Sequence, residues 1–564
     1  MSLMSMRRKM ASKQTVTIIL WILIAVFLAG IILIGVPSSN RTKPQVRYRN
    51  GVNTVLVTIN GTSIDSDTFE QAFNDSFAKS GRTPDLSETL QERSKILTNM
   101  AQNIVADQVL RGFGVKNVKK QATKMAGEIA VMFVDSMRNA TKAQAEQDMA
   151  NATAEEKKNV RSAQERLEEQ LSQMYLQQGV QPPTRVTEDG FRKFYVQALI
   201  DPQYGQSEDF LLYVQKRLIG QQIIKRDLPS DLFADAFMKK LAMQQVNARW
   251  IFIPAGGEVA VGDSKAKIFQ PEFTREALQA AEKKARELRE QIVKDPSSFA
   301  KVAEKESRHI SHTTGGDLGW ISGASMQSNN PALLEYLIFS QRPKEIGPVT
   351  QITLPGPDPM NPLMAQVGYG FVQVLAESKN PDVPEWDKMR DEFVNNMQRR
   401  YEMQIGEGYL CYMIANADIK YNSKEIEAYM AQAHGQYVKM TNLQKGALKE
   451  KDLPKSVVAA LSYRVAISSR DVKGEEKIEL LKAALPFADS GRSDLHLQLA
   501  DTYRALGKKE EAITQYENAM RSANMGEEQL RQQVRAIYKQ MGYSEGVKAI
   551  DQWLEEFKKK NEAK

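Results

Sequence analysis

The segment that decides the fold is GGDLGW, residues Gly315 to Trp320, which predicts a glycine turn leading into a strand. Upstream, residues 248–254 (ARWIFIP) have the aromatic and β-branched character of a strand, and residues 274–293 have the pattern of a charged helix. Downstream, residues 367–375 (VGYGFVQVL) alternate as a last strand would. These segments together predict a compact α+β unit over residues 246–378.

The chain on both sides of this unit is expected to be mostly helical. Residues 55–61 (VLVTING) form the exception, because they predict a strand that ends in an Asn-Gly turn. Helical patterns follow over residues 87–245, and residues 384–418 predict one long amphipathic helix.

The C-terminal part repeats. Gly474, Gly507 and Gly542 are 33 and 35 residues apart, and a period near 34 built from helix pairs is typical of a tetratricopeptide array. An ordinary helical bundle is the alternative. The middle unit is the clearest, and its predicted packing positions are Leu499, Ala500, Tyr503, Gly507, Ala512, Tyr516 and Ala519.

The N-terminal region predicts a membrane anchor. Residues 15–36 hold 22 positions without a charge, and at about 1.5 Å per residue this length crosses a hydrocarbon layer of roughly 30 Å. Residues 1–14 are then a cytoplasmic N-terminus and residues 37–50 a linker. Basic residues flank both ends of this segment, so the distribution of positive charge favours the two membrane orientations almost equally. The shortness of the leading segment favours export of the C-terminal body.

Composition excludes several functions. The net charge of +7 over 564 residues comes with no basic patch beyond the first 50 residues, so we expect no nucleic-acid partner. A single cysteine, Cys411, rules out an internal disulfide and a cysteine-built zinc site. His309 and His312 are three residues apart, but without further ligands they predict a solvated loop. We therefore expect no metal and no cofactor.

Two segments carry a resemblance to known families. The 246–378 unit resembles a parvulin-type (PpiC) peptidyl-prolyl cis-trans isomerase, or rotamase, domain through the GGDLGW run, the following Met326 and the Gly368-Tyr369 pair. Residues 55–73 resemble the N-terminal chaperone segment of the SurA and PpiD proteins. With an anchor and a returning helix, the layout is similar to the PpiD-type foldases, which are membrane-anchored periplasmic chaperones. The tetratricopeptide tail is an addition to that pattern.

The residue patterns and the resemblance together predict a multidomain, mostly α-helical protein with one α+β parvulin domain, one N-terminal transmembrane helix and a C-terminal α-helical tetratricopeptide solenoid. It also implies a single-pass protein of the bacterial inner membrane with its body in the periplasm. The expected units are a SurA-like chaperone domain (51–245), the parvulin-like domain (246–378), a returning helix of the chaperone domain (379–422) and the repeat domain (423–564).

The chemistry departs from the parvulin pattern. The resemblance implies a histidine at the position of Trp250 in the first strand and another at Gly370 in the last, with His309 as the nearest counterpart of a third network member. Neither an indole nor a glycine can replace imidazole as a proton carrier and acceptor. We therefore expect little or no isomerase activity. The candidates for binding peptide are Leu318, Met326, Leu334 and Phe339.

Three functional hypotheses follow. The first is a membrane-tethered, non-catalytic chaperone that binds unfolded or newly translocated polypeptides near the secretion channel. The second is an active prolyl isomerase with an altered pocket. The third is a scaffold whose repeat array recruits a protein partner, with the lipid bilayer contacted only through residues 15–36.

Overall fold

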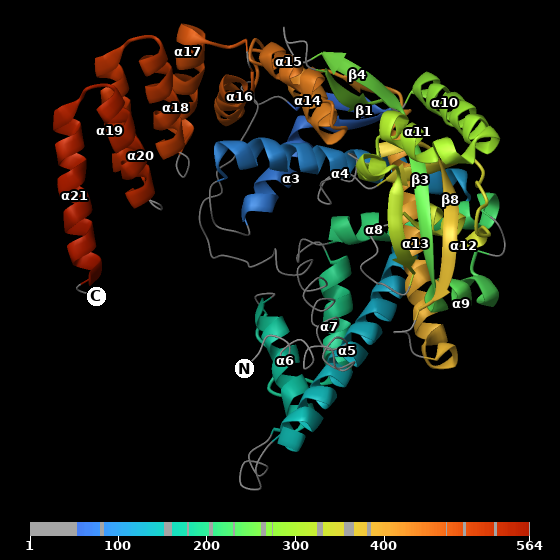
Figure 1. Ribbon diagram of the computed structural model, residues 1–564. Helices are drawn as coiled ribbons and strands as arrows, with labels where there is room; N and C mark the ends of the chain where they lie inside the picture. Colours follow the sequence, from blue (N-terminus) through green and yellow to red (C-terminus); the bar gives the residue numbers. More distant parts are fainter. Residues whose placement is uncertain are drawn as a thin grey trace.

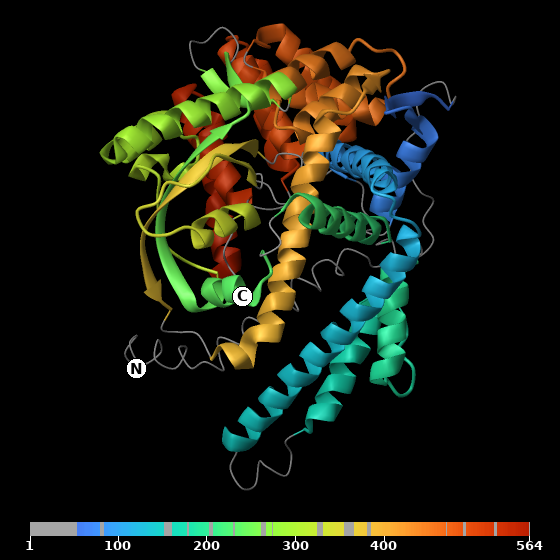
Figure 2. The same ribbon diagram turned by 90° about the vertical axis from the view of Figure 1, so that its right-hand side faces the viewer.

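The computed structural model describes most of the chain and is mostly helical (Figures 1 and 2). The described residues are 53–78, 84–151, 161–177, 180–201, 207–228, 232–260, 267–272, 274–323, 331–354, 366–380, 385–469, 471–488, 492–523 and 527–562. The predicted membrane span (15–36), the linker (37–50) and Met326 lie outside them. Among the helices that are described, none combines the length and the apolar character needed to cross a membrane.

A small sheet joins the beginning of the described chain to a distant segment. Strands β1 (Val55–Ile59) and β2 (Thr62–Asp65) form a hairpin whose turn residues, Asn60 and Gly61, have φ of 48° and 82°. The short strand β9 (Ile419–Tyr421) pairs with the other edge of β1, so the sheet order is β2-β1-β9. Helices α3 (Ser66–Ala78) and α4 (Leu86–Gly112) follow the hairpin.

Three helices form an arm that projects from the body (Figures 1 and 2). They are α5 (Val118–Asn151), α6 (Ala163–Gln177) and α7 (Glu188–Ile200). The arm has an aromatic core made by Phe133, Tyr175, Phe191, Phe194 and Tyr195.

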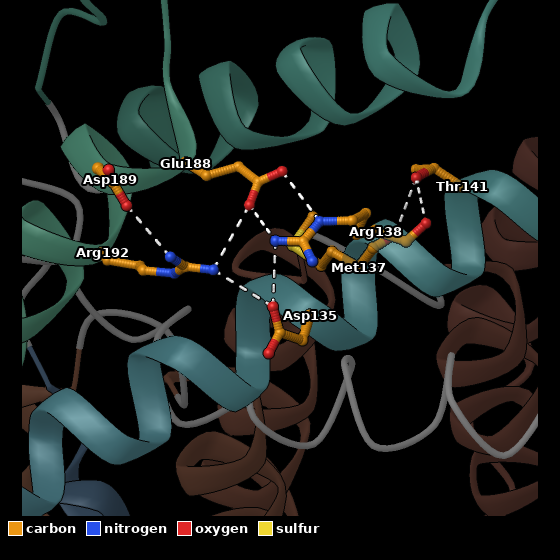
Figure 3. Close-up of polar contacts among 7 residues, drawn as sticks. All are labelled: Asp135, Met137, Arg138, Thr141, Glu188, Asp189 and Arg192. Carbon is orange, nitrogen blue, oxygen red and sulfur yellow. Dashed lines mark hydrogen bonds and ion pairs between the residues drawn. The ribbon is translucent and has the colours of Figure 1, made fainter.

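An ionic network on the arm's surface links α5 to α7 (Figure 3). Nε of Arg138 donates to Glu188 at 3.0 Å, while Arg192 bridges to Asp135 at 3.2 Å and to Asp189 at 3.1 Å. Such partly exposed pairs contribute little each. The buried aromatic rings therefore supply most of the arm's cohesion.

Two helices from opposite sides of the α+β unit cross at backbone contact. Helix α8 (Ser207–Asp227) precedes the unit, and α13 (Trp386–Ala415) follows it. A Cβ atom built on Gly220 would lie 1.9 Å from the carbonyl oxygen of Glu402, and one built on Gly406 would lie 1.8 Å from that of Lys216. Beside the crossing, Arg217 and Glu402 form a buried ion pair with a nitrogen–oxygen distance of 2.6 Å. Only glycine allows this approach. Helix α9 (Asp235–Met243) also packs on α13.

The α+β unit contains a four-stranded antiparallel sheet of order β6-β3-β8-β7. Its strands are β3 (Gln244–Pro254), β6 (Asp317–Ser322), β7 (Thr350–Leu354) and β8 (Gln366–Lys379). Its helices are α10 (Arg275–Lys294), η3 (Pro296–Ser298), α11 (Phe299–Glu306), η4 (Ile310–Thr314) and α12 (Ala332–Ser340). A separate hairpin of β4 (Gly256–Ala260) and β5 (Lys267–Pro271), which the sequence analysis missed, is inserted after β3.

The C-terminal part consists of consecutive helix pairs in the described residues. The helices are α14 (Lys424–Ala433), α15 (Tyr437–Ala447), α16 (Lys455–Ser468), α17 (Gly474–Ala484), η6 (Leu485–Phe487), α18 (Arg492–Ala505), α19 (Lys509–Arg521), α20 (Glu527–Gln540) and α21 (Ser544–Glu562). Gly474, Gly507 and Gly542 all have positive φ at the turn inside a pair. Gly435, with φ 69°, plays the same part between α14 and α15, a further pair that the sequence period did not indicate.

A buried arginine ties the first of these pairs to the N-terminal helices. The guanidinium of Arg93 in α4 donates two bonds to Glu70 of α3 at 3.0 and 2.7 Å, and its Nε donates to Glu425 of α14 at 3.1 Å. It also lies 4.7 Å from the ring centroid of Phe69. Because removing one partner of a buried ion pair leaves an uncompensated charge, this contact holds α14 firmly on α4.

We expect Gly406→Ala to destabilise the protein by about 1–3 kcal/mol, because the added methyl group must push two helix backbones apart. Gly127 is the matched control, since it also lies inside a helix but nothing lies within 4 Å of a Cβ built there. Gly127→Ala should stabilise by about 0.5–1 kcal/mol through helix propensity alone. Urea denaturation measures both, and equal effects of the two substitutions would contradict the close crossing.

Candidate functional site

The indole of Trp250 lies inside the α+β unit, against one face of its sheet. Because side chains alternate along β3, Ile251 points to the opposite face, where it packs with residues of α10 and α11. Trp250 is fully buried, and its ring stacks on Phe252 with centroids 5.4 Å apart. The first of the two positions where the resemblance implies histidine is therefore filled by a large core side chain.

His309 holds the indole in place. It caps η4, and its Nδ1 accepts hydrogen bonds from Nε1 of Trp250 at 3.0 Å and from the backbone N–H of Ser311 at 3.2 Å. An accepting Nδ1 carries no proton, so the neutral ring carries its proton on Nε2. Burial, and then the neighbouring His312, lower the pKa of His309. The imidazole is therefore a neutral acceptor engaged with the indole.

Gly370 leaves the room that the indole occupies. It lies opposite Phe252 in the β3–β8 ladder. A Cβ atom built there would be 2.7 Å from the carbonyl oxygen of Ile251 and 3.4 Å from two ring carbons of Trp250. Any longer side chain would meet the indole face. Tryptophan at 250 and glycine at 370 are thus sterically complementary, and a histidine at 370 does not fit beside this tryptophan.

Two glycines of the GGDLGW turn pack directly against the backbone of β3 and against α11. The backbone N–H of Trp250 donates to the carbonyl of Gly316 at 2.9 Å. Gly316 has φ 83°, and a Cβ there would be 2.5 Å from the carbonyl oxygen of Trp250. Gly315 has φ 65°, and a Cβ there would be 2.8 Å from Cβ of Ala300 in α11. Both glycines are required by this double approach.

The structure separates the proposed peptide-binding residues. Leu318 is half-buried on β6, whereas Leu334 and Phe339 of α12 are each only 1% exposed. These two are core residues, so in this conformation they are not available to a bound peptide. The reason is that α12 is held against α13, where Arg400 donates to the buried carboxylate of Glu335 at 3.0 and 3.1 Å.

Two exposed apolar side chains near the turn were missed by the sequence analysis. Trp320 is 51% exposed on β6, and Ile310 is 82% exposed on η4. The alternation along β6 indicates that Trp320 and Ile321 point to opposite faces, but the exposure of an η4 residue has no sequence signal.

The predicted repeat-packing residues lie in the core of the C-terminal helices or at the turn between them. All the predicted side chains are buried, and Gly507 forms the αL turn between α18 and α19. These buried side chains are Leu499, Ala500, Tyr503, Ala512, Tyr516 and Ala519. Within the described residues no cluster of histidine, cysteine and carboxylate side chains is suited to hold a metal.

Comparison with known proteins identifies the domain. Residues 267–352 match the family model described as Rotamase, PPIC-type PPIASE domain. No curated protein matches the chain.

Among solved structures, the chain is similar to peptidylprolyl isomerase PrsA of Bacillus anthracis, with 14% identity, a TM-score of 0.17 and coverage of 63% of this chain and 99% of that one. It is also similar to PrsA of Bacillus subtilis (11% identity, TM-score 0.15, 71% and 97% covered) and to foldase protein PrsA of Streptococcus pneumoniae (14%, 0.19, 73% and 98%).

The chain therefore contains a PpiC, or parvulin-type, peptidyl-prolyl isomerase domain. The matched range includes His309, Leu318 and the GGDLGW turn. Trp250 and Gly370 lie on the two central strands outside it, and the sheet brings them together.

We expect Gly370→Ala to destabilise the protein by about 1–3 kcal/mol, since the methyl group meets a backbone oxygen and the indole. The cost should fall in a Trp250→Ala background, which removes one of these neighbours. Gly257→Ala is the control, because a Cβ at this strand glycine has no neighbour within 4 Å. Urea denaturation of the four variants and the wild type gives the coupling, and strict additivity of the two substitutions would contradict the complementarity.

His309 should titrate below the ordinary histidine pKa and carry its proton on Nε2. Because the folded-state pKa is lowered, the stability it contributes is complete above the unfolded pKa of about 6.5 and is lost as pH falls through the folded pKa. The chain has four histidines, so ¹⁵N-histidine NMR can follow each one, with His309→Asn providing the assignment. An Nδ1-protonated tautomer would rule out the bond from Trp250, and a pKa at or above 6.5 would contradict the burial of the His309 ring.

Proposed function

We propose that this chain is a polypeptide-binding chaperone whose PPIC-type domain has little or no isomerase activity. The observation that carries the proposal is the buried contact of Trp250, Gly370 and His309. The indole Nε1–H is only a donor, and it is already bonded to His309 at 3.0 Å. Where the resemblance implies a pair of imidazoles, the site thus holds an indole whose one donor is already used in a hydrogen bond to His309.

The chemistry of prolyl isomerisation explains why this matters. The uncatalysed rotation faces a barrier of about 18–20 kcal/mol, and an enzyme lowers it with placed dipoles around the twisting amide. A stacked indole at zero exposure offers no free polar group to that amide. The domain keeps the fold as a binding and structural unit.

Chaperone activity is supported by apolar side chains on the arm. Val131, Met132 and Met149 of α5 are 43%, 44% and 46% exposed, and Leu176 of α6 is 52% exposed. Flexible methionine side chains suit a surface that accepts many partners. The arm's aromatic core leaves Val131, Met149 and Leu176 accessible to unfolded polypeptides, whereas Sδ of Met132 accepts a hydrogen bond from Arg399 at 2.7 Å.

The proposed setting is the bacterial inner membrane, with residues 15–36 as a single-pass anchor and the body in the periplasm near the secretion channel. The 22 uncharged residues of that segment support this placement. Residues 423–564 would form a tetratricopeptide-type array that recruits a protein partner, supported by the positive-φ glycines at corresponding turns. Tethering raises the local concentration near the membrane, so weak contacts with a client suffice.

The test compares two activities of the full-length protein in lipid nanodiscs. We expect no acceleration of cis-to-trans conversion in a proline peptide, together with clear suppression of aggregation of an unfolded protein. Strong prolyl turnover would overturn the proposal in favour of an active isomerase with an altered pocket. Neither activity would favour a scaffold built around the repeats.

A matched pair of variants locates the chaperone surface. Substitution of Val131, Met149 and Leu176 by serine should weaken aggregation suppression several-fold, because exposed apolar contacts are lost. The control is a second triple variant outside the arm, with serine at Val293, Ile467 and Leu506, which are 50%, 41% and 42% exposed. Equal effects of the two variants would show that the arm is not the binding surface.

A further inference from the structure

A pocket lies between the inserted hairpin and the first C-terminal helix pair. Val259 and Gln270 line it from β4 and β5, and the other lining residues come from α14 and α15; these are Lys424, Val438, Lys439, Asn442 and Leu443. Its volume is about 390 Å³, which is within the range of pockets that hold small organic groups. Nε2 of Gln436, just before α15, makes a long contact of 3.5 Å with the carbonyl of Pro271 at the end of the hairpin.

The apolar part of the pocket is formed by Val259, Val438 and Leu443, which are all half-buried. They come from both sides of the junction. A branched aliphatic side chain of a ligand would bury its surface there, at a gain of about 25 cal/mol per Å².

Two lysine side chains, Lys424 and Lys439, lie at the rim of the pocket. Lys424 makes no ion pair with a described residue, whereas Lys439 is paired with Glu427 at 3.0 Å. The stem of Lys424 is positioned by Gly446, because a Cβ there would lie 2.7 Å from Cδ and 3.2 Å from Nζ of Lys424. The carboxylate of Glu450 accepts from the backbone N–H of Lys424 at 2.7 Å, while the Lys424 ammonium has no carboxylate of its own among the described residues and favours an anionic group at the opening.

Gln270, which lines the pocket, carries a side-chain acceptor without a donor from the described residues. Oε1 of Gln270 is buried and has no hydrogen-bond partner in the described structure. Such a group carries a desolvation cost until a donor reaches it. A ligand that satisfies the pocket therefore combines an apolar group, a carboxylate and an N–H group.

We propose that this pocket binds the C-terminal residue of a polypeptide, with its α-carboxylate at Lys424 and Lys439, its amide N–H at Gln270 and an aliphatic side chain among Val259, Val438 and Leu443. The inference rests on the proposed function, since it names a class of polypeptide that the chaperone recognises. The pocket requires both the hairpin and the helix pair, so it exists only where the isomerase-type domain meets the C-terminal array.

The experiment measures fluorescence anisotropy of labelled nonapeptides with the full-length protein in nanodiscs. A peptide ending in leucine with a free carboxylate should bind, and the same peptide with a C-terminal amide should bind at least about tenfold more weakly, as loss of a charge-assisted hydrogen bond implies. Equal binding of the two peptides would overturn the proposal.

Variants assign the binding to this pocket. Lys424→Gln should reduce affinity for the free-carboxylate peptide about tenfold, whereas Lys449→Gln, which removes an exposed lysine beyond the end of α15, should leave it unchanged. Wild-type affinity in Lys424→Gln would place the site elsewhere. If 4-methylpentanoate competes as well as the peptide binds, the ligand is a free carboxylic acid and the polypeptide assignment is overturned.

Aggregation suppression separates this inference from the proposed function. Lys424→Gln should retain suppression, because the arm is unchanged. If Lys424→Gln loses binding of the peptide C-terminus but retains aggregation suppression, the pocket is supported as the binding site for the C-terminus. If the wild-type protein does not suppress aggregation, the chaperone proposal is contradicted, whatever the peptide measurements show.

Discussion

Gly220 and Gly406 let α8 and α13 cross at backbone contact, and the rest of the chain is arranged around that crossing. The two helices flank the isomerase-type domain in sequence, so their contact makes this domain an insertion in a continuous helical body. Carbonyl oxygens lie where Cβ atoms would stand, and the buried Arg217–Glu402 pair at 2.6 Å fixes the register. Few other arrangements of the two helices are possible, because a small shift would separate the Arg217–Glu402 pair or make the helix backbones clash.

Buried charges then join the other parts to this body. Arg93 connects α3 and α4 to α14, and Glu335 with Arg400 holds α12 on α13. Each contact links segments far apart in sequence. Arg93 thus fixes α14 of the first C-terminal helix pair on α4, and the pocket lies where this pair meets the inserted hairpin.

The candidate site illustrates where inference from residues stops. The absence of histidine at positions 250 and 370 is visible from the resemblance alone. What replaces the imidazoles is not, because the fit of the Trp250 indole over Gly370 and its bond to His309 depend on two central strands and a loop that meet only in the fold. Burial of Leu334 and Phe339 has a similar origin. Their apolar character suits a pocket and a core equally well, and docking of α12 on α13 decides between them.

By itself the sequence determined the local elements, because periodicity, turn glycines and caps act over a few residues. The GGDLGW turn, the long helix at α13 and the repeated glycines at 474, 507 and 542 are of this kind. Tertiary structure alone decided the pairing of β9 with β1 and the pocket between the β4–β5 hairpin and α15. Both depend on steric fit between segments more than a hundred positions apart along the chain, and no local pattern encodes such a contact.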